Sequence, residues 1–278
     1  MAASADPSCP SIALVGFGEA GSVFASAGNW AGKARGWDIL PERREAMAGC
    51  GVEAEPGPAE ALAGAQLVLS LVTADAALWV AEAYAPYLEE GAVWCDMNSV
   101  APQTKQNAAA AVEHLGGNYI DVAVMAPVDR AALDVPLLIS GPEAEQAERL
   151  LNQAGFANTR VVGAEVGRAS AIKMIRSVMV KGMEALTDEC AAAARAAGVY
   201  DEVMVSLDAS ERGWNWMQKA EYNRERMETH GARRAAEMEQ VAATLRALGV
   251  DPLMTEAAVV RQRGAAGKKQ DTDRKSAA

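Results

Sequence analysis

Short apolar runs alternate with helical segments in the first part of the chain, up to residue 163. The run 66–72, QLVLSLV, is continuous and of strand length, which is typical of a central parallel strand covered on both faces. Strands separated by helices predict an α/β fold with a Rossmann-type, doubly wound parallel sheet. The expected strands are 12–15, 34–37, one near 52, 66–72, 92–96, 119–124, 135–140 and 159–162, and the expected helices are 19–27, 41–49, 59–63, 74–87, 102–115 and 142–154.

Helical periodicity replaces this alternation after Gly163. The sequence therefore predicts a first domain at 1–163 and an all-α C-terminal domain at 164–263. The polar, basic residues 264–278 are expected to form a disordered tail, because they contain too few apolar side chains to bury. The helices expected in the second domain are 169–198, 221–248 and 253–263.

Three glycines follow the first apolar run in G-x-G-x-x-G spacing, within SIALVGFGEAG. Gly16 permits a tight turn, Gly18 lets a pyrophosphate approach the backbone, and Gly21 lets the next helix pack against the strand. Asp38 stands where the second strand should end, and a carboxylate there accepts hydrogen bonds from an adenosine ribose. The pattern predicts a dinucleotide site at the helix N-terminus, with a structural glycine turn as the alternative. The other residues of the loop are Phe17, Glu19 and Ala20.

Length, charge and cysteine content limit the number of domains and the kinds of partner that the chain can have. The 278 residues allow one large domain or two ordinary ones. A formal net charge of −11 argues against nucleic acid as a partner, and an anionic ligand would need a local positive patch. The four cysteines are scattered, which indicates free thiols and no metal site. Since neither a signal peptide nor a membrane span is visible, we expect a cytoplasmic protein.

Ligands of open α/β sheets bind outside the carboxyl ends of the strands. The short polar side chains of Asn98 and Ser99, which follow one expected strand, are suited to orient a ribose or a substrate. Asn98 has an equally good alternative role as a cap of the following helix. The other residues at these ends are Val72, Thr73 and the segment 124–128.

A basic segment, GRASAIKMIRSVMVK, opens the long helix. Lys173, Arg176, Ser177 and Lys181 fall at i, i+3, i+4 and i+8, so they are expected to share one helix face. This face would supply the positive patch that an anionic ligand needs. A lysine beside another cation has a lowered pKa, which is the condition for a general base. A solvated helix face is an equally good interpretation of the spacing alone.

Two other features have no assigned role. His230, in the basic stretch THGARR, is interpreted as a surface histidine. Trp214 and Trp216 are candidates for lining a pocket for an aromatic or large substrate. Packing in the core or in a subunit interface is the favoured interpretation of this pair.

Four motifs occur in a characteristic order: G-x-G-x-x-G at 16–21, D-M-x-S/T at 96–99, D-x-x-V at 121–124 and G-x-x-x-x-x-K at 167–173. In this combination the chain resembles the β-hydroxyacid dehydrogenases, which include 3-hydroxyisobutyrate dehydrogenase, tartronate semialdehyde reductase and 6-phosphogluconate dehydrogenase. The resemblance covers roughly residues 11–200. The helical part beyond it looks like the C-terminal domain of a phosphogluconate dehydrogenase-like subgroup.

The resemblance implies an oxidoreductase that transfers hydride between NAD or NADP and a hydroxy acid or related alcohol. Lys173 matches the family's catalytic lysine, which takes the hydroxyl proton in oxidation and returns it in reduction. Ser99 matches the residue near the nicotinamide ribose, and Asp38 matches the ribose-binding position. Val72 and Thr73 match the loop that passes the cofactor.

Two departures from the family pattern concern the substrate. The family usually has Ser-Gly-Gly where this chain has Met125, Ala126 and Pro127. The family asparagine one turn after the lysine is replaced by Arg176 or Ser177, and Arg176 is suited to grip a carboxylate or phosphate. We therefore expect a small-molecule substrate, anionic or aromatic, other than that of the well-known members.

Several alternatives remain open. Asp38 favours NAD by repelling a 2′-phosphate, whereas Arg43 and Arg44 are near enough to bind one if their loop folds back. The long helix and the alanine-rich second domain suggest a homodimer or larger oligomer. An imine reductase resembles the same family but usually lacks the lysine. A non-catalytic nucleotide-binding regulator would need the glycine loop and would have no use for Lys173.

Overall fold

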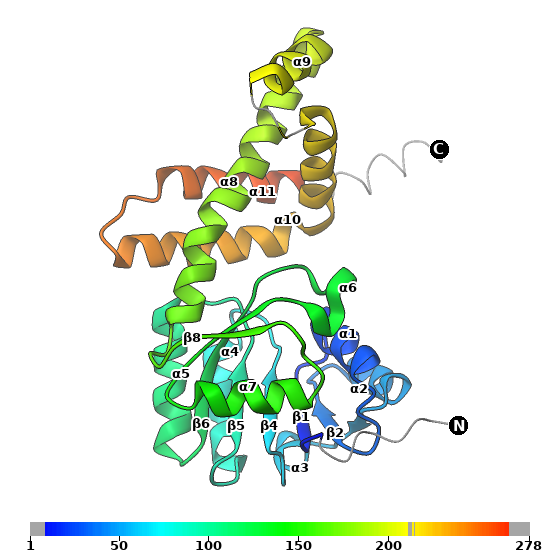
Figure 1. Ribbon diagram of the computed structural model, residues 1–278, viewed down its shortest axis with the longest axis vertical. Coiled ribbons are helices and arrows are strands. Elements are labelled where there is room, and N and C mark those ends of the chain that lie inside the picture. Colours follow the sequence, from blue (N-terminus) through cyan, green and yellow to red (C-terminus); the bar gives the residue numbers. More distant parts are fainter. Residues whose placement is uncertain (1–8, 211–212, 214, 267–278) are drawn as a thin grey trace. The chain divides into compact units, whose positions relative to one another are not determined.

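The structure is a computed structural model that describes residues 9–210, 213 and 215–266 (Figure 1). It divides into two compact units, with the boundary between Lys173 and Met174, inside the long helix α8 (Arg168–Ala197). The boundary expected from the sequence lies between residues 163 and 164. The first turns of α8, which carry Lys173, therefore belong to the first unit.

An eight-stranded sheet forms the centre of the first unit, in the order β3-β2-β1-β4-β5-β6-β7-β8. The strand order reverses at β1, which confirms the doubly wound arrangement. The neighbours β6 and β7 pair antiparallel, which corrects the expectation of a wholly parallel sheet. Their connection holds only the short helices α6 (Val128–Ala131) and η3 (Ala132–Asp134), whereas a parallel pair needs a longer crossover. The strands are β1 (Ile12–Val15), β2 (Ala34–Trp37), β3 (Glu53–Ala54), β4 (Leu67–Ser70), β5 (Val93–Asp96), β6 (Asn118–Val124), β7 (Leu137–Ser140) and β8 (Thr159–Gly163).

Helices cover both faces of this sheet. Along β1, Ile12 and Leu14 lie in one apolar core while Ala13 and Val15 lie in the other. Helices α1, α2 and α7 contribute to the first core, and α3, α4 and α5 contribute to the second. Burial on both faces explains why the strands read as continuous apolar runs. The helices are α1 (Glu19–Gly28), α2 (Pro41–Met47), α3 (Pro58–Leu62), α4 (Ala77–Tyr84), α5 (Pro102–His114) and α7 (Ala144–Gln153).

The second unit is helical. Buried side chains of α8, α10 and α11 form a core that includes Met238 and Val241, and a smaller cluster around Met204 joins α8, α9 and α10. Of the expected tail, Gly264 and Ala265 end α11, and residues 267–278 lie outside the described residues. The helices beside α8 are α9 (Tyr200–Ser210), α10 (Trp216–Ala247) and α11 (Leu253–Ala265).

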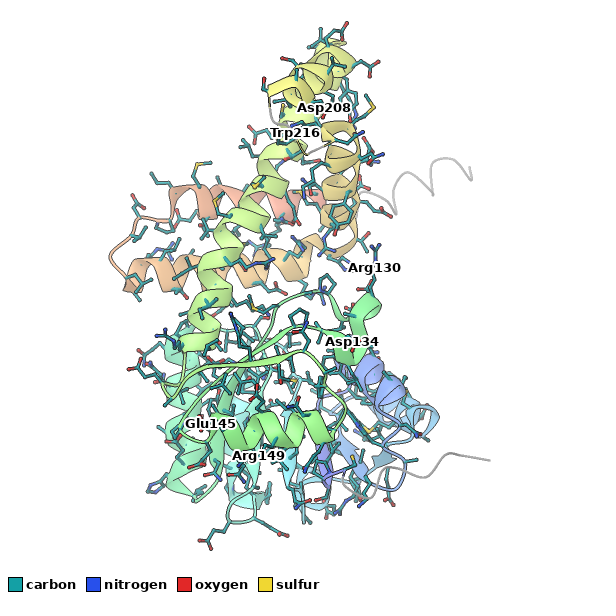
Figure 2. All side chains as sticks on the ribbon, viewed as in Figure 1. Arg130, Asp134, Glu145, Arg149, Asp208 and Trp216 are labelled. Atoms are coloured by element: carbon teal, nitrogen blue, oxygen red, sulfur yellow. The ribbon has the colours of Figure 1, made fainter. Side chains whose placement is uncertain are left out.

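The turn between α9 and α10 differs from the sequence expectation. Helix α9 is absent from the elements predicted above, and α10 begins at Trp216 rather than at residue 221. Two side chains cap the first turn of α10. Asn215 accepts the backbone N–H of Gln218 at 2.9 Å, and Asp208 of α9 accepts that of Trp216 at 2.7 Å (Figure 2). Because two of the free N–H groups of the first turn are satisfied, the helix extends further toward its N-terminus.

Candidate functional site

The glycine loop between β1 and α1 has the geometry that its spacing predicts. Gly16 has a φ of +88°, and a Cβ there would lie 2.7 Å from the carbonyl oxygen of Leu71. A Cβ on Gly21 would lie 3.0 Å from the carbonyl oxygen of Gly16. At Gly18, by contrast, no described heavy atom lies within 4 Å of the Cβ position. The loop is therefore tight at Gly16 and Gly21 and open at Gly18, the N-cap of α1, where a pyrophosphate would approach.

Asp38 fastens this loop to the end of β2. Its Oδ2 accepts the backbone N–H of Phe17 at 2.7 Å, and its Oδ1 accepts that of Leu40 at 2.9 Å. The Phe17 side chain is buried in the core, while Glu19 is exposed in the first turn of α1 and Ala20 packs against the core. The carboxylate thus lies beside the glycine loop and holds it to the segment after β2.

Arg44 is held by the loop that follows β2. Its Nη1 donates to the carbonyl oxygen of Asp38 at 2.6 Å and to that of Ile39 at 3.2 Å. The guanidinium carbon lies 4.6 Å from the centroid of the Trp37 ring, within cation–π range. Arg43, by contrast, is exposed in α2. Of the two arginines near Asp38, Arg44 therefore already contacts two backbone carbonyls and the Trp37 ring.

Val72 and Thr73 follow β4 and border the glycine loop. The Cγ1 atom of Val72 is 2.9 Å from the Cβ position of Gly16, so this side chain also requires glycine there. Thr73 is exposed, and its hydroxyl hydrogen-bonds to Asp75. This bond, together with backbone N–H donors, lowers the pKa of the Asp75 carboxyl below its ordinary value. The loop therefore presents an anchored hydroxyl beside the predicted phosphate site.

Lys173 and Ser99 meet, although 74 positions separate them in sequence. The Nζ atom of Lys173 donates a hydrogen bond to the Ser99 hydroxyl. Ser99 follows β5, Lys173 lies in the first turns of α8, and both side chains are half-buried. Two residues that the sequence singled out on separate grounds thus form one amine–hydroxyl pair within the first unit.

The segment 125–127 after β6 has mixed exposure. The backbone N–H of Met125 donates to the carbonyl oxygen of Pro136 at 2.9 Å, and its side chain packs on the cluster that contains Ala169. Ala126 and Pro127 are exposed. Met125 therefore serves packing, and the surface that a ligand could touch is that of Ala126 and Pro127.

The other three residues expected on the face of Lys173 belong to the second unit. Arg176 is exposed, whereas Ser177 and Lys181 are buried. Lys181 forms an ion pair with Glu237 of α10. Burial lowers the pKa of Lys181, and the Glu237 carboxylate opposes that shift. The anion that compensates Lys181 is therefore a side chain of this chain.

Sequence reasoning missed a set of buried polar side chains in the first unit. Asp96, Lys105 and Asp121 are at most 1% exposed, and Lys105 lies 2.9 Å from Asp96 and 3.4 Å from Asp121. Tyr119 donates to Asp96 at 2.5 Å, and burial together with these carboxylates raises the pKa of Tyr119. A signal was present, because Asp96 and Asp121 are carboxylates in otherwise apolar strands.

Of the histidine and the two tryptophans without an assigned role, His230 and Trp216 lie in α10. His230 is half-buried in α10. Trp216 packs against the small cluster around Met204, which agrees with the packing interpretation. Trp214 lies outside the described residues.

Metal and membrane sites were also considered. Within residues 9–210, 213 and 215–266, no group of three or more His, Cys, Asp or Glu side chains is placed to hold a metal ion. No helix in these ranges is both long and apolar enough to cross a bilayer. The four cysteines are thiols, and burial raises the pKa of Cys95.

Comparison with known families gives two matches along the chain. The family described as the NAD binding domain of 6-phosphogluconate dehydrogenase matches residues 11–163, more than half of the 278 residues. A domain of unknown function, DUF1932, matches residues 194–264. The first match spans the whole sheet, and the second lies within the helical unit.

Three individual proteins are similar to this chain in sequence or in fold. An uncharacterized 28.5 kDa protein of Methanothermus fervidus is 30% identical over 145 residues, which are 52% of this chain and about half (54%) of that protein. A conserved hypothetical protein from Sinorhizobium meliloti is 38% identical, with a TM-score of 0.73 over 91% of this chain and 87% of that one. The fold is also that of 3-hydroxyisobutyrate dehydrogenase from Mycobacterium tuberculosis, solved with L-serine, with a TM-score of 0.77, 18% identity and coverage of 92% and 94%.

Proposed function

Since the chain belongs to the family described as the NAD binding domain of 6-phosphogluconate dehydrogenase, we propose that it is an oxidoreductase acting on a hydroxy acid or related alcohol. It would transfer hydride between this substrate and a nicotinamide dinucleotide. The observation that carries the proposal is the contact of Lys173 with Ser99 in the same unit as the glycine loop. A proton-transferring amine and a dinucleotide cradle are the two parts that this chemistry needs.

The residues present fit a nicotinamide dinucleotide. The open space at Gly18 and the N-terminal N–H groups of α1 would hold the pyrophosphate, and Asp38 would accept from the adenosine ribose. Val72 and Thr73 would border it, and Ser99 would contact the nicotinamide ribose. When bound, the nicotinamide ring accepts or returns the hydride.

Lys173 would act as the general acid and base. In oxidation its neutral Nζ would take the proton of the substrate hydroxyl, and in reduction its ammonium would return one. The Ser99 hydroxyl holds Nζ in place and lets the lysine share a proton with a polar neighbour. We propose substrate contacts for Ala126 and Pro127, the exposed part of the segment 125–127, and for Arg176 and Ser177 in the turn of α8 after Lys173. Arg176 would be the group for an anionic substrate.

NAD is favoured over NADP on local grounds. The Asp38 carboxylate would repel a 2′-phosphate on the adenosine ribose, and Arg44 is already engaged with two backbone carbonyls and Trp37. Arg43 is exposed and would be the residue that admits NADP. This preference is small, because one exposed arginine near the ribose offsets part of the repulsion.

We also propose a homodimer or larger oligomer in the cytoplasm, with no membrane or nucleic-acid partner. Exposed apolar side chains on α8, α9 and α11, among them Met179, Val205 and Val260, support association through the second unit. A sedimentation mass near the 29.1 kDa of one chain would exclude an oligomer.

Two other functions fit less well. An imine reductase would share the fold and the cofactor, but the lysine counts against it. A nucleotide-binding regulator without turnover would use the glycine loop. It would have no need of a proton-transferring Lys173–Ser99 pair.

The direct test is a thermal-shift titration with NAD, NADH, NADP and NADPH, followed by a turnover screen with the nucleotides that bind. A nucleotide at 100 times its Kd should stabilise the protein by about 2.7 kcal/mol, a shift of several degrees. The substrate panel should include 3-hydroxyisobutyrate, L-serine, larger β-hydroxy acids and a set of imines. Absence of any shift at millimolar nucleotide would contradict the proposal. Binding without turnover of any alcohol or imine would favour the regulator, and turnover of imines alone would favour the imine reductase.

A further inference from the structure

Two buried carboxylates face each other in neighbouring strands of the first unit. Asp96 ends β5, Asp121 lies in β6, and the two are directly paired in the parallel register. Their exposed fractions are 1% and 0%. Two carboxylates brought together in a low-dielectric interior repel strongly unless a cation lies between them. The arrangement therefore depends on the group that separates their charges.

Lys105 of α5 is that group. Its side chain is 0% exposed, and its Nζ lies 2.9 Å from Asp96 Oδ1 and 3.4 Å from Asp121 Oδ1. The same Nζ donates to the backbone carbonyl oxygen of Asp96 at 2.6 Å. Two of the three ammonium donors thus form hydrogen bonds with Asp96, and Asp121 is an ion-pair partner. Lys105 thereby ties the end of β5 and the middle of β6 to α5.

Asp121 fixes the start of α8. It accepts the backbone N–H of Ser170 at 2.9 Å and the Ser170 hydroxyl at 2.6 Å. Ser140 donates to Asp121 at 3.3 Å and accepts the backbone N–H of Ala169 at 3.0 Å. The first N–H groups of α8 are thus satisfied from the sheet, and an anion at a helix N-terminus is favourable. Lys173 follows Ser170 by three residues, so it lies one turn further along the same side of the helix.

Asp96 fixes the loop that carries Ser99. Its Oδ1 accepts both the backbone N–H of Asn98, at 2.9 Å, and the side-chain amide of Asn98, at 2.7 Å. The same amide donates to Ser70 at 3.0 Å, and Tyr119 donates to the other carboxylate oxygen of Asp96 at 2.5 Å. Asn98 is held by β4 and β5 together, and Ser99 is the next residue.

We propose that Lys105 is a positioning residue for the proton-transferring pair: by joining Asp121, which holds the start of α8, to Asp96, which holds the Ser99 loop, it sets the distance between Lys173 and Ser99. The proposal rests on the function proposed above and extends it to residues that touch neither cofactor nor substrate. Lys105 and the two carboxylates act as one unit, because removal of the ammonium leaves two facing charges that would push the two anchors apart.

The first test uses two variants that perturb the group differently. Lys105→Met keeps most of the side-chain volume and leaves the two carboxylates without their cation. Asp121→Asn keeps an oxygen for the Ser170 N–H and keeps the Lys105–Asp96 pair, so it should fold even if the first variant does not accumulate. Each should lower kcat by about 10- to 100-fold with less than about a twofold change in nucleotide affinity, because a displacement of an ångström is enough for such a loss. Asp134→Asn, a change of an exposed aspartate in η3 (Figure 2), is the matched control and should leave both unchanged.

A second readout needs no substrate. Reductive methylation with ¹³C-formaldehyde labels accessible lysines, and the Lys173 signal is identified by its loss in Lys173→Arg. Asp121→Asn should shift this signal, and Asp134→Asn should not. An unshifted Lys173 signal in Asp121→Asn, with normal kcat in its folded fraction, would overturn the positioning role and leave a purely structural ion cluster. If the wild-type protein shows no nicotinamide-dependent turnover, the proposed function fails, while the Lys173 signal still decides whether the buried group positions this side chain.

Discussion

The two units bury polar side chains in different ways. In the first unit, Lys105 lies between Asp96, at the end of β5, and Asp121, within β6. These carboxylates also accept hydrogen bonds from a loop N–H and a helix N–H. In the second unit, Arg234 of α10 forms an ion pair with Glu184 of α8, and both side chains are 6% exposed. Asn223 of α10 is 0% exposed, and neither atom of its amide has a hydrogen-bond partner among the described residues.

The difference shows what each set of polar groups does. The polar groups of the first unit meet at the carboxyl ends of strands, where α/β sheets bind ligands, and they lead to Lys173 and Ser99. In the second unit, the buried Arg234–Glu184 pair links one helix to another. Changes in the first set should therefore act mainly on turnover, and changes in the second mainly on the free energy of unfolding.

The largest effect is expected from Lys173→Ala. Loss of the general acid and base should lower kcat at least 100-fold. Nucleotide affinity should stay within about twofold, because the glycine loop and Asp38 are untouched. The change is measured by steady-state kinetics with the substrate found in the screen, together with a nucleotide titration.

Lys33→Ala is the matched control, since Lys33 lies in the turn before β2, away from the Lys173–Ser99 pair. Its kcat should be that of the wild type. Near-normal turnover in Lys173→Ala would show that another group moves the proton. It would also contradict the expectation that changes in the polar groups of the first unit act mainly on turnover.

Arg234→Met should act on stability instead. It leaves Glu184 buried with the more distant Arg226, at 3.7 Å, and Gln262, at 3.4 Å. Stranding a buried carboxylate should lower the free energy of unfolding by about 3 kcal/mol and Tm by roughly 5–10 °C. Differential scanning calorimetry or denaturant unfolding measures the loss, and kcat of the folded protein should stay within about threefold.

Two further variants separate charge burial from general disruption. Glu184→Gln in the Arg234→Met background removes the stranded charge and should recover part of the lost stability. Arg263→Met breaks an exposed pair with Glu239, with side chains 58% and 49% exposed, and should cost under about 1 kcal/mol. If Arg234→Met and Arg263→Met were equally mild, the buried pair would not stabilise the second unit.

How much of the fold the sequence predicts depends on whether the interactions that determine it are local or distant along the chain. The strands and the glycine loop were predictable because apolar runs and turn geometry act locally, as Gly16 with its φ of +88° illustrates. The antiparallel pairing of β6 and β7 was missed because strand direction depends on how the connection folds, which the apolar pattern does not encode. Helix α9 was missed because it lies between the helices expected at 169–198 and 221–248, where no element was predicted.

The candidate site was predictable only in part, for the same reason. Lys173 and Ser99 were each identified by type and local spacing, whereas their contact depends on tertiary structure. Lys105 appeared as an ordinary helix lysine, because nothing in its own segment shows that Asp96 and Asp121 converge on it. Likewise, Lys181 was grouped with Lys173 by helical spacing, and only the packing of α10 supplies Glu237 as its partner.

The smallest effect should come from Asp38→Asn, which tests whether every polar group at the strand ends serves ligand binding. The amide oxygen can still accept one of the two N–H groups, from Phe17 or Leu40, that the carboxylate holds, so the glycine loop should survive. Removing the charge should raise NADP affinity relative to NAD by about five- to tenfold, as expected for one charge facing a phosphate in partly solvated surroundings. Glu42→Gln, a charge removal at an exposed site in the first turn of α2, should leave the ratio unchanged. If Asp38→Asn leaves the ratio unchanged as well, the carboxylate anchors the loop without discriminating between nucleotides, and Asp38 belongs with Asp96 and Asp121 among the groups that act by holding backbone in place.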